Sequence, residues 1–245
     1  MIRNICSINF CNIPFRLFSK ICKIGLLTVF VPFTRINTLT AGPVKCNTHT
    51  TNPGKKITRF ADGTLLLDIT TSTEYEAPRT GSDAWPHLLI QQDFENRPNV
   101  GRISRLDFTM ELRIVHCDKK MTDAEFNESL HTAQSPFYFF MRNVNPDSPD
   151  YQLSLWVGVP SFDYRYPRLD STEYVQWDIG TATYIYAIPP RTIWGDVSFH
   201  DLKWHCARLD LLPLIRQGVA AMKDKGQFLH TDLDDLELMG MNFGW

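Results

Sequence analysis

The chain has 245 residues, enough for one large domain, and its 43% hydrophobic and 21% charged residues are typical of a globular protein. A formal net charge of -2 supplies no basic surface, which argues against nucleic acid and anionic lipid as partners. Aromatic residues are numerous, with 16 Phe, 8 Tyr and 6 Trp. Most of them lie in short apolar runs, and this pattern favours β-structure.

Residues 1–41 have the pattern of a leader. Basic residues without any acidic residue occupy 1–23, and a ten-residue, mostly apolar run follows at 24–33. This order, with small residues near Ala41, is typical of an export signal, and ten residues are too few to span a bilayer. We predict a secreted or cell-surface protein whose mature domain is not stably inserted in a membrane. A wrongly assigned start codon and a membrane anchor are the alternatives.

A Pro/Gly/Thr-rich linker is predicted over 42–56, followed by one domain over 57–245. Three of the six cysteines lie in the predicted leader, which leaves Cys46, Cys117 and Cys206. Three cysteines allow at most one disulfide, and no CxxC or CxxxH spacing indicates zinc. We therefore expect buried thiols, no metal site and no cofactor.

From residue 57 onward, short apolar runs alternate with turn clusters, as in a sandwich of two sheets. The clearest strand is predicted at 103–115, where apolar and polar residues alternate. The run 137–141 is apolar on both faces and is expected in the middle of the sandwich or under a loop. The further predicted strands are 65–70, 87–91, 151–159, 174–178, 183–188, 203–209 and 237–245.

One amphipathic helix is predicted after Asp210, which can cap it, with Pro213 in its first turn and Gly226 at its end. Its apolar stripe predicts packing across one edge of the sandwich. We interpret it as a packing element without a chemical role.

Sugar-binding sites combine Trp or Tyr rings with polar side chains, because a sugar offers both C–H faces and hydroxyl groups. Several segments here have this mixture, although aromatic residues of strands more often pack in the core. The candidate carbohydrate-binding residues are Trp85, Gln152, Ser154, Trp156, Asp163, Tyr164, Trp177, Asp178 and Tyr184.

Two stretches and the helix between them carry a family resemblance. The run Tyr151-Gln152-Leu153-Ser154-Leu155-Trp156 is similar to a strand that reads roughly Tyr-Glu-Ile-Met-Ile-Trp, and the strand ending at Gly244-Trp245 follows the helix. In this order the elements resemble the small jelly-roll endoglucanases that cut cellulose and xyloglucan, within the concanavalin A-like group of lectins and glucanases. The resemblance implies an all-β, concanavalin-like jelly-roll β-sandwich with one amphipathic surface helix and a polysaccharide partner.

The departures from that family concern catalysis. Gln152 replaces the glutamate nucleophile, and the acid/base glutamate has no counterpart up to residue 245. Retaining hydrolysis needs two carboxyl groups roughly 5 to 5.5 Å apart, and an amide cannot form the covalent intermediate. The strand at 237–245 is expected to be an unpaired edge, which suggests a truncated reading frame.

Other carboxylates provide no evident catalytic pair. Asp107 and Glu111 are about 13 Å apart along their strand, and we expect them to be solvated or bound to nearby arginines such as Arg105. Asp232, Asp234 and Asp235 lack the spacing of an EF-hand and are expected to form a solvated turn.

The leading hypothesis is therefore non-catalytic binding of a β-glucan-type polysaccharide or oligosaccharide by an extracytoplasmic sandwich. A glycoside hydrolase or polysaccharide lyase with unidentified or missing catalytic residues is the first alternative. A protein-binding adhesion or scaffold domain, which shares the fold and needs no polar groove, is the second.

Overall fold

The structure, a computed structural model, describes residues 2–9, 45–46, 54–59, 64–170, 174–179 and 181–245. The strands are β1 (Ile2–Asn9), β2 (Lys45–Cys46), β3 (Lys55–Arg59), β4 (Leu65–Thr70), β5 (Leu89–Asp93), β6 (Asp107–Lys119), β7 (Gln134–Asn143), β8 (Ser154–Asp163), β9 (Tyr174–Asp178), β10 (Thr183–Ala187), β11 (His205–Asp210) and β12 (Leu236–Gly244). The α-helices are α1 (Pro190–Trp194) and α2 (Leu212–Asp224), and the 3-10 helices are η1 (Thr71–Thr73), η2 (Val100–Arg102), η3 (Phe199–Asp201) and η4 (Leu233–Asp235).

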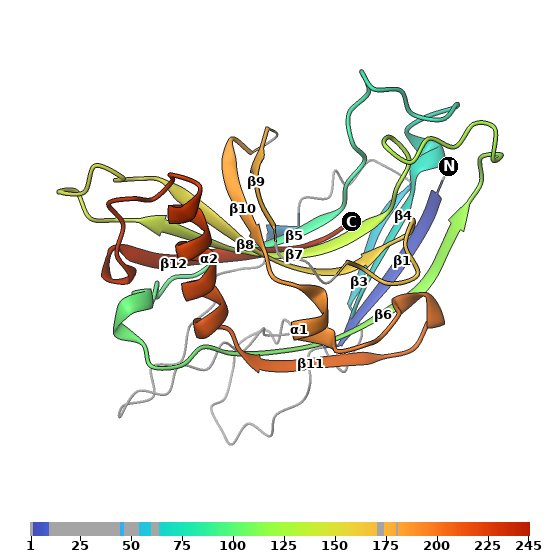
Figure 1. Cartoon of the computed structure of the whole chain (residues 1–245). Coiled ribbons are helices and arrows are strands. Elements are labelled where there is room, and N and C mark those ends of the chain that lie inside the picture. Colours follow the sequence, from blue (N-terminus) through green and yellow to red (C-terminus); the bar gives the residue numbers. More distant parts are fainter. Residues whose placement is uncertain (1, 10–44, 47–53, 60–63, 171–173, 180) are drawn as a thin grey trace.

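The strands form two sheets that pack against each other (Figure 1). The five-stranded sheet has the order β11-β6-β1-β4-β3, and the seven-stranded sheet has the order β2-β5-β12-β7-β8-β10-β9. β8 and β10 are parallel, whereas β12 is antiparallel to both of its neighbours. The predicted fold class, an all-β sandwich, is confirmed. A second, short helix, α1, was not predicted.

Alternating side chains of the two sheets form the core. On β6, Phe108 is fully buried between the sheets, and its ring lies 5.5 Å from that of Phe137 and 5.7 Å from that of Phe139 on β7. Burying one such side chain stabilises the fold by roughly 1.5–3 kcal/mol. The prediction that 137–141 lies in the middle of the sandwich is confirmed for these two residues, because β7 is the fourth of seven strands.

The middle strand of the five-stranded sheet, β1, comes from the segment that we predicted as a leader. It pairs with β4 on one side and with β6 on the other. Residues 10–44 and 47–53, with most of the predicted leader and linker, lie outside the described residues. The division into leader, linker and domain stays a prediction, and β1 provides a direct test of it.

We predict that a chain of residues 42–245 is less stable than the full chain, because β4 and β6 lose the strand between them. Thermal unfolding of the two chains, followed by circular dichroism, measures the difference. An equal melting temperature would show that β1 is dispensable and would favour the leader interpretation.

Most strands lie within a few residues of their predicted positions, and β4 and β9 have the predicted bounds. One prediction for the strand at 151–159 is wrong. Gln152 lies in the turn before β8, with a φ of 70°, and not on a strand. Its N–H donates to the carbonyl oxygen of Asn143 at 2.9 Å, which closes the connection between β7 and β8. This local turn interrupts the alternation that the side chains suggested.

The predicted edge position of the C-terminal strand is also wrong. β12 lies inside the seven-stranded sheet, paired with β5 on one side and β7 on the other. Beyond the strand, Trp245 exchanges two backbone hydrogen bonds with Leu88, of 3.0 and 3.1 Å. Since β12 is paired on both sides, the edge argument for truncation does not hold. The sequence could not show this, because pairing between distant segments leaves no mark in a local pattern.

Several smaller predictions concern charged groups and thiols. Asp107 pairs with Arg105, with 2.6 Å between a carboxylate oxygen and Nε, as expected. The expectation of buried thiols is wrong for Cys206, which is exposed on β11, whereas Cys117 is half-buried; neither forms a disulfide. Burial raises the pKa of the Cys117 thiol to about 12, so this thiol stays protonated at neutral pH.

Helix α2 packs against β9 and β10 on the core side of the seven-stranded sheet, the side to which Tyr186 and Val157 point. The predicted cap residue is wrong by one position, because the N-cap is Leu211 and its side chain makes no capping hydrogen bond. Asp210 lies just before it, and its Oδ1 accepts the N–H of Leu212 at 3.1 Å. Gly226 follows the helix with a φ of 75°, as predicted. At Gly218 the helix approaches the ring of Tyr186, and a Cβ there would lie 2.6 Å from Cδ1 of that ring. Close packing at this point therefore requires glycine.

We predict that Gly218→Ala destabilises the protein by about 1–3 kcal/mol, because overpacking outweighs the roughly 1 kcal/mol by which alanine favours a helix. Gln217→Ala, at an exposed position of the same helix, is the control and should change little. Urea unfolding measures both variants. A stabilised Gly218→Ala protein would contradict the packing of α2 on Tyr186.

Candidate functional site

The surface of the seven-stranded sheet that looks away from the core is called the outer face here. Successive side chains of a strand point to opposite faces, so the residues between the core positions of β7 point to the outer face. Cross-strand partners share a face. The pairs Phe140 with Trp156 and Tyr138 with Asn242 therefore lie together on the outer face.

Three rings on the outer face form what we call the Trp156 cluster, made of Tyr138, Phe140 and Trp156. The ring centre of Trp156 lies 4.6 Å from that of Phe140 and 5.6 Å from that of Tyr138. All three side chains are half-buried. Gly158, opposite Tyr138, makes room for this arrangement, because a Cβ there would come within 3.0 Å of the Tyr138 ring.

Polar groups accompany the Trp156 cluster. Asn242 is only 7% exposed, and among the described residues its Oδ1 has no hydrogen-bond partner. Burial, with smaller contributions from Tyr174 and Asp178, raises the pKa of Tyr138, so its hydroxyl stays protonated and can donate. An unpaired buried acceptor costs about 1–3 kcal/mol, and a ligand hydroxyl would remove that cost.

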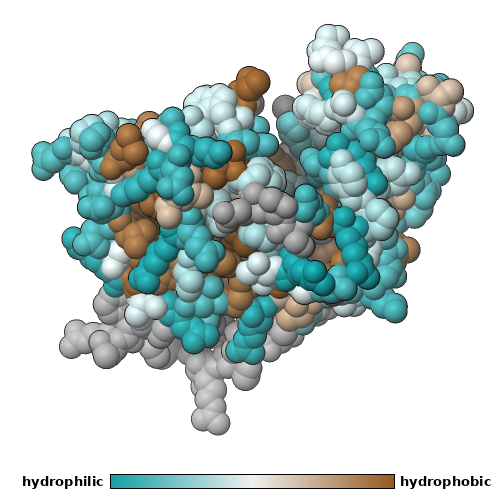
Figure 2. Space-filling model, in the orientation of Figure 1, coloured by the Kyte–Doolittle hydropathy of each residue, from teal (hydrophilic) through white to brown (hydrophobic). Residues whose placement is uncertain are grey.

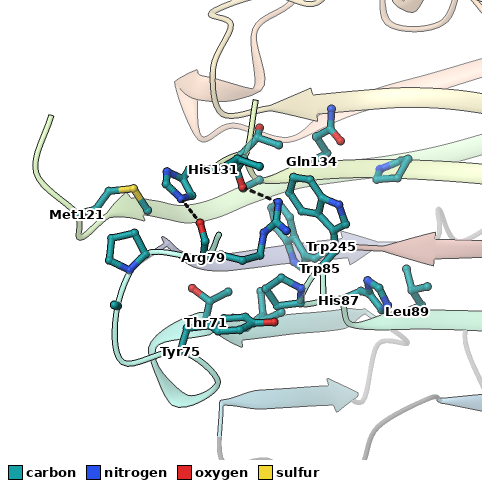
Figure 3. Close-up of a pocket in the computed structure, with 18 residues that line it drawn as sticks. Thr71, Tyr75, Arg79, Trp85, His87, Leu89, Met121, His131, Gln134 and Trp245 are labelled. Carbon is teal, nitrogen blue, oxygen red and sulfur yellow. Dashed lines mark hydrogen bonds between the residues drawn. The ribbon is translucent and has the colours of Figure 1, made fainter. Parts of the chain in front are cut away.

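One end of the outer face meets a pocket of about 260 Å³, which we call the Trp85 pocket (Figure 3). Its floor includes Leu89, Gln134 and Pro136, which point to the outer face at the starts of β5 and β7. Its walls come from the segments 71–87 and 121–133, which rise at the upper right of Figure 1. Figure 2 shows the surface hollowed between these segments and the β9–β10 hairpin.

Trp85 is 47% exposed and is held in place by Arg79. The guanidinium carbon of Arg79 lies 3.7 Å from the ring centre of Trp85. The same buried guanidinium donates to the carbonyl oxygens of Thr80 and Asp83, at 3.1 and 2.7 Å, and to that of Leu130 at 3.1 Å. Arg79 therefore positions the indole and joins the two walls.

His131 strengthens the same connection (Figure 3). Its Nε2 lies 2.7 Å from the carbonyl oxygen of Arg79, and its Nδ1 accepts the N–H of Asn127 at 2.9 Å. Because a carbonyl can only accept, these partners require the neutral tautomer with hydrogen on Nε2. Burial and the charge of Lys55 lower the pKa of the pocket residue His87, which favours its neutral form as well.

Several of the predicted site residues lie on or next to the outer face. Trp156 belongs to the Trp156 cluster, Ser154 precedes it on β8, and Trp85 lines the pocket. Gln152 is exposed in the turn at the opposite end, where its Oε1 accepts from Arg142 at 3.4 Å. Sequence alternation placed Ser154 and Trp156 on one face, and the register supports this placement.

The remaining candidates have other surroundings. Trp177 and Tyr184, with ring centres 5.0 Å apart, share the face of the core residue Leu155, and so lie opposite to the Trp156 cluster. The register places Asp178 on the outer face, but its carboxylate accepts from Thr181 in the β9–β10 turn.

Asp163 and Tyr164 hold the end of β8. The Asp163 carboxylate is 4% exposed and accepts from Thr132, Gln134 and Arg165. Burial alone would raise its pKa, but these hydrogen bonds outweigh burial and keep the pKa below its usual range. Asp163 thereby orients Gln134 at the pocket floor, and Tyr164 packs edge-on against Phe126.

The structure adds site residues that the sequence reasoning missed, namely Arg79, Gln134, Tyr138, Phe140 and Asn242. Tyr138 and Phe140 were assigned to the core because their run is apolar throughout. Strict alternation with Phe137 and Phe139 was the available signal.

Among the described residues, no group of three or more His, Cys, Asp or Glu side chains is placed to hold a metal ion. In the same part of the chain, every helix is too short or too polar to cross a membrane.

Comparisons with known proteins include a similarity to a solved structure. No family model and no curated protein matches the chain. Among solved structures it is similar to a meso-active, thermostable cellulase derived from the Cel12A cellulase of Rhodothermus marinus, with 14% identity, 82% of each chain covered and a TM-score of 0.42. The function proposed below rests on the geometry of the outer face.

We predict that Arg79→Ala lowers stability by about 1.5–3 kcal/mol and increases the mobility of Trp85, because three carbonyl groups lose a charged donor. Arg79→Lys keeps the charge but not the forked donor, so it should restore only part of the stability. Arg216→Ala, an exposed arginine of α2, is the control. Thermal unfolding and tryptophan fluorescence measure the effects. A fully stable Arg79→Ala protein would show that Arg79 does not join the walls.

Proposed function

We propose that the protein binds a β-glucan-type polysaccharide or oligosaccharide along the outer face of the seven-stranded sheet, without cleaving it. The observation that carries this proposal is the Trp156 cluster beside the unpartnered Oδ1 of Asn242. Half-buried rings offer flat apolar surfaces to the C–H face of a sugar. The buried acceptor and the Tyr138 hydroxyl provide hydrogen bonds for its hydroxyl groups.

Two features support binding without cleavage. Gln152, at the position of the nucleophile in the family that the sequence resembles, is an amide and lies in an exposed turn. An amide binds hydroxyl groups through its C=O and NH₂ but does not attack a glycosidic carbon. Asp163, the buried carboxylate near the pocket, accepts its hydrogen bonds from protein donors.

The proposal includes a location outside the cytoplasm, where polysaccharides are accessible. It rests on the leader pattern of residues 1–41. The proposed binding of a glycan also gives a reason for the half-exposed aromatic residues of the outer face, which a sandwich used only as a scaffold does not require.

We predict that Trp156→Ala weakens binding of a soluble β-glucan by about 1–3 kcal/mol, or roughly 5- to 150-fold, if the ring is a stacking platform. Trp177→Ala is the matched control, because this indole is exposed on the opposite face. Its affinity should equal that of the wild type. Isothermal titration calorimetry measures the affinities, and a reducing-end assay measures cleavage.

Each result has a distinct meaning. Binding without new reducing ends, lost in Trp156→Ala only, supports the proposal. New reducing ends would show a glycoside hydrolase, and the absence of binding to any glucan would favour a scaffold function. Equal losses in the two tryptophan variants would contradict the assignment to the outer face.

A further inference from the structure

The Trp85 pocket and the Trp156 cluster lie on one continuous track. Along β7, Gln134 and Pro136 line the pocket, and the next two outward residues, Tyr138 and Phe140, belong to the cluster. From Pro136 to Phe140 the strand advances about 13 Å at its usual rise. An extended ligand that covers the cluster and follows β7 toward its start therefore reaches the pocket.

At the pocket the track meets a fixed wall. The segment 71–87 and the segment 121–133 are joined by the hydrogen bonds of Arg79 with Leu130 and of His131 with Arg79. The guanidinium that makes the first bond also supports the indole of Trp85. Because these groups are buried and mutually bonded, the wall is preformed and need not be ordered by the ligand.

The size and polarity of the pocket suit a single ring. Its volume of about 260 Å³ lies just below the roughly 300–1,000 Å³ of pockets for drug-sized ligands. Trp85 and Tyr75 supply aromatic surface, and Gln134 presents an amide that Asp163 orients at 2.8 Å. This combination of rings and an oriented amide suits one neutral sugar unit.

We propose that the Trp85 pocket is a terminal subsite, which receives the end unit of a glycan chain. The protein then binds chain ends, with the rest of the chain lying over the Trp156 cluster, and not the interiors of long chains. This inference rests on the proposed function. It adds that the wall fixes the position of the chain along the track.

The test uses linear β-glucan fractions of different mean chain length, compared at equal mass by isothermal titration calorimetry with the full chain. If the protein binds only one of the two kinds of chain end, each glucan chain binds one protein. The amount of protein bound per gram of glucan then rises as the chains become shorter. Binding to chain interiors predicts a constant amount per gram and several proteins on each long chain. The second result would overturn the terminal subsite.

Variants of the pocket make the test specific. Trp85→Ala should lower the affinity for short oligosaccharides about 5- to 100-fold. Trp204→Ala is the matched control, because this indole is also exposed and also has an arginine, Arg113, near its ring, at 5.3 Å. It does not line the Trp85 pocket and should bind as the wild type does.

Gln134→Ala provides a second measurement that does not depend on the stacked pair of Arg79 and Trp85. We expect a loss of roughly 5-fold, the value of about one hydrogen bond. Unchanged affinity in both pocket variants, each folded by circular dichroism, would overturn the inference even if the glucan binds. If the wild type binds no fraction at all, the proposed function itself fails.

Discussion

The packing of Phe108 between Phe137 and Phe139 is the contact on which the arrangement of this protein depends. It joins the five-stranded sheet to the seven-stranded sheet through rings that are fully or almost fully buried. Because side chains alternate along a strand, placing Phe137 and Phe139 in the core turns Tyr138 and Phe140 to the other side. The same constraint therefore forms the core and supplies the aromatic surface of the outer face.

One group on the outer face, the buried side chain of Asn242, lowers the stability of the fold. A buried, unpartnered oxygen of Asn242 lowers stability by an amount comparable to a lost hydrogen bond. Such local conflicts are expected at functional sites, where the rest of the fold compensates for them.

The rigid walls of the Trp85 pocket favour the binding of a ligand. Arg79 and His131 use buried hydrogen bonds to hold two long connecting segments together, although such segments are usually the most variable parts of a sandwich. A ligand that meets a preformed surface loses less entropy of the protein on binding. The pairing of Arg79 with Trp85 thus provides both stability of the walls and a defined aromatic surface.

The sequence by itself determined the fold class, most strand positions and the amphipathic helix that follows Asp210. These features depend on local periodicity, which a single strand or helix expresses in its own residues. It also identified Trp85 and Trp156 as candidate carbohydrate-binding residues, since each tryptophan lies beside polar residues in the sequence. The assignment of the glycan partner followed from this pattern and from a family resemblance.

Only the tertiary structure decided which candidates share a surface. The register between β8, β9 and β10 separates Trp177 and Tyr184 from Trp156, and the turn closed by Asn143 removes Gln152 from the strand. The inner position of β12, which brings Asn242 beside Tyr138, depends on pairing between segments about a hundred residues apart. Such contacts are set by the energy of the whole sheet and not by any local pattern, so no single stretch of sequence reveals them.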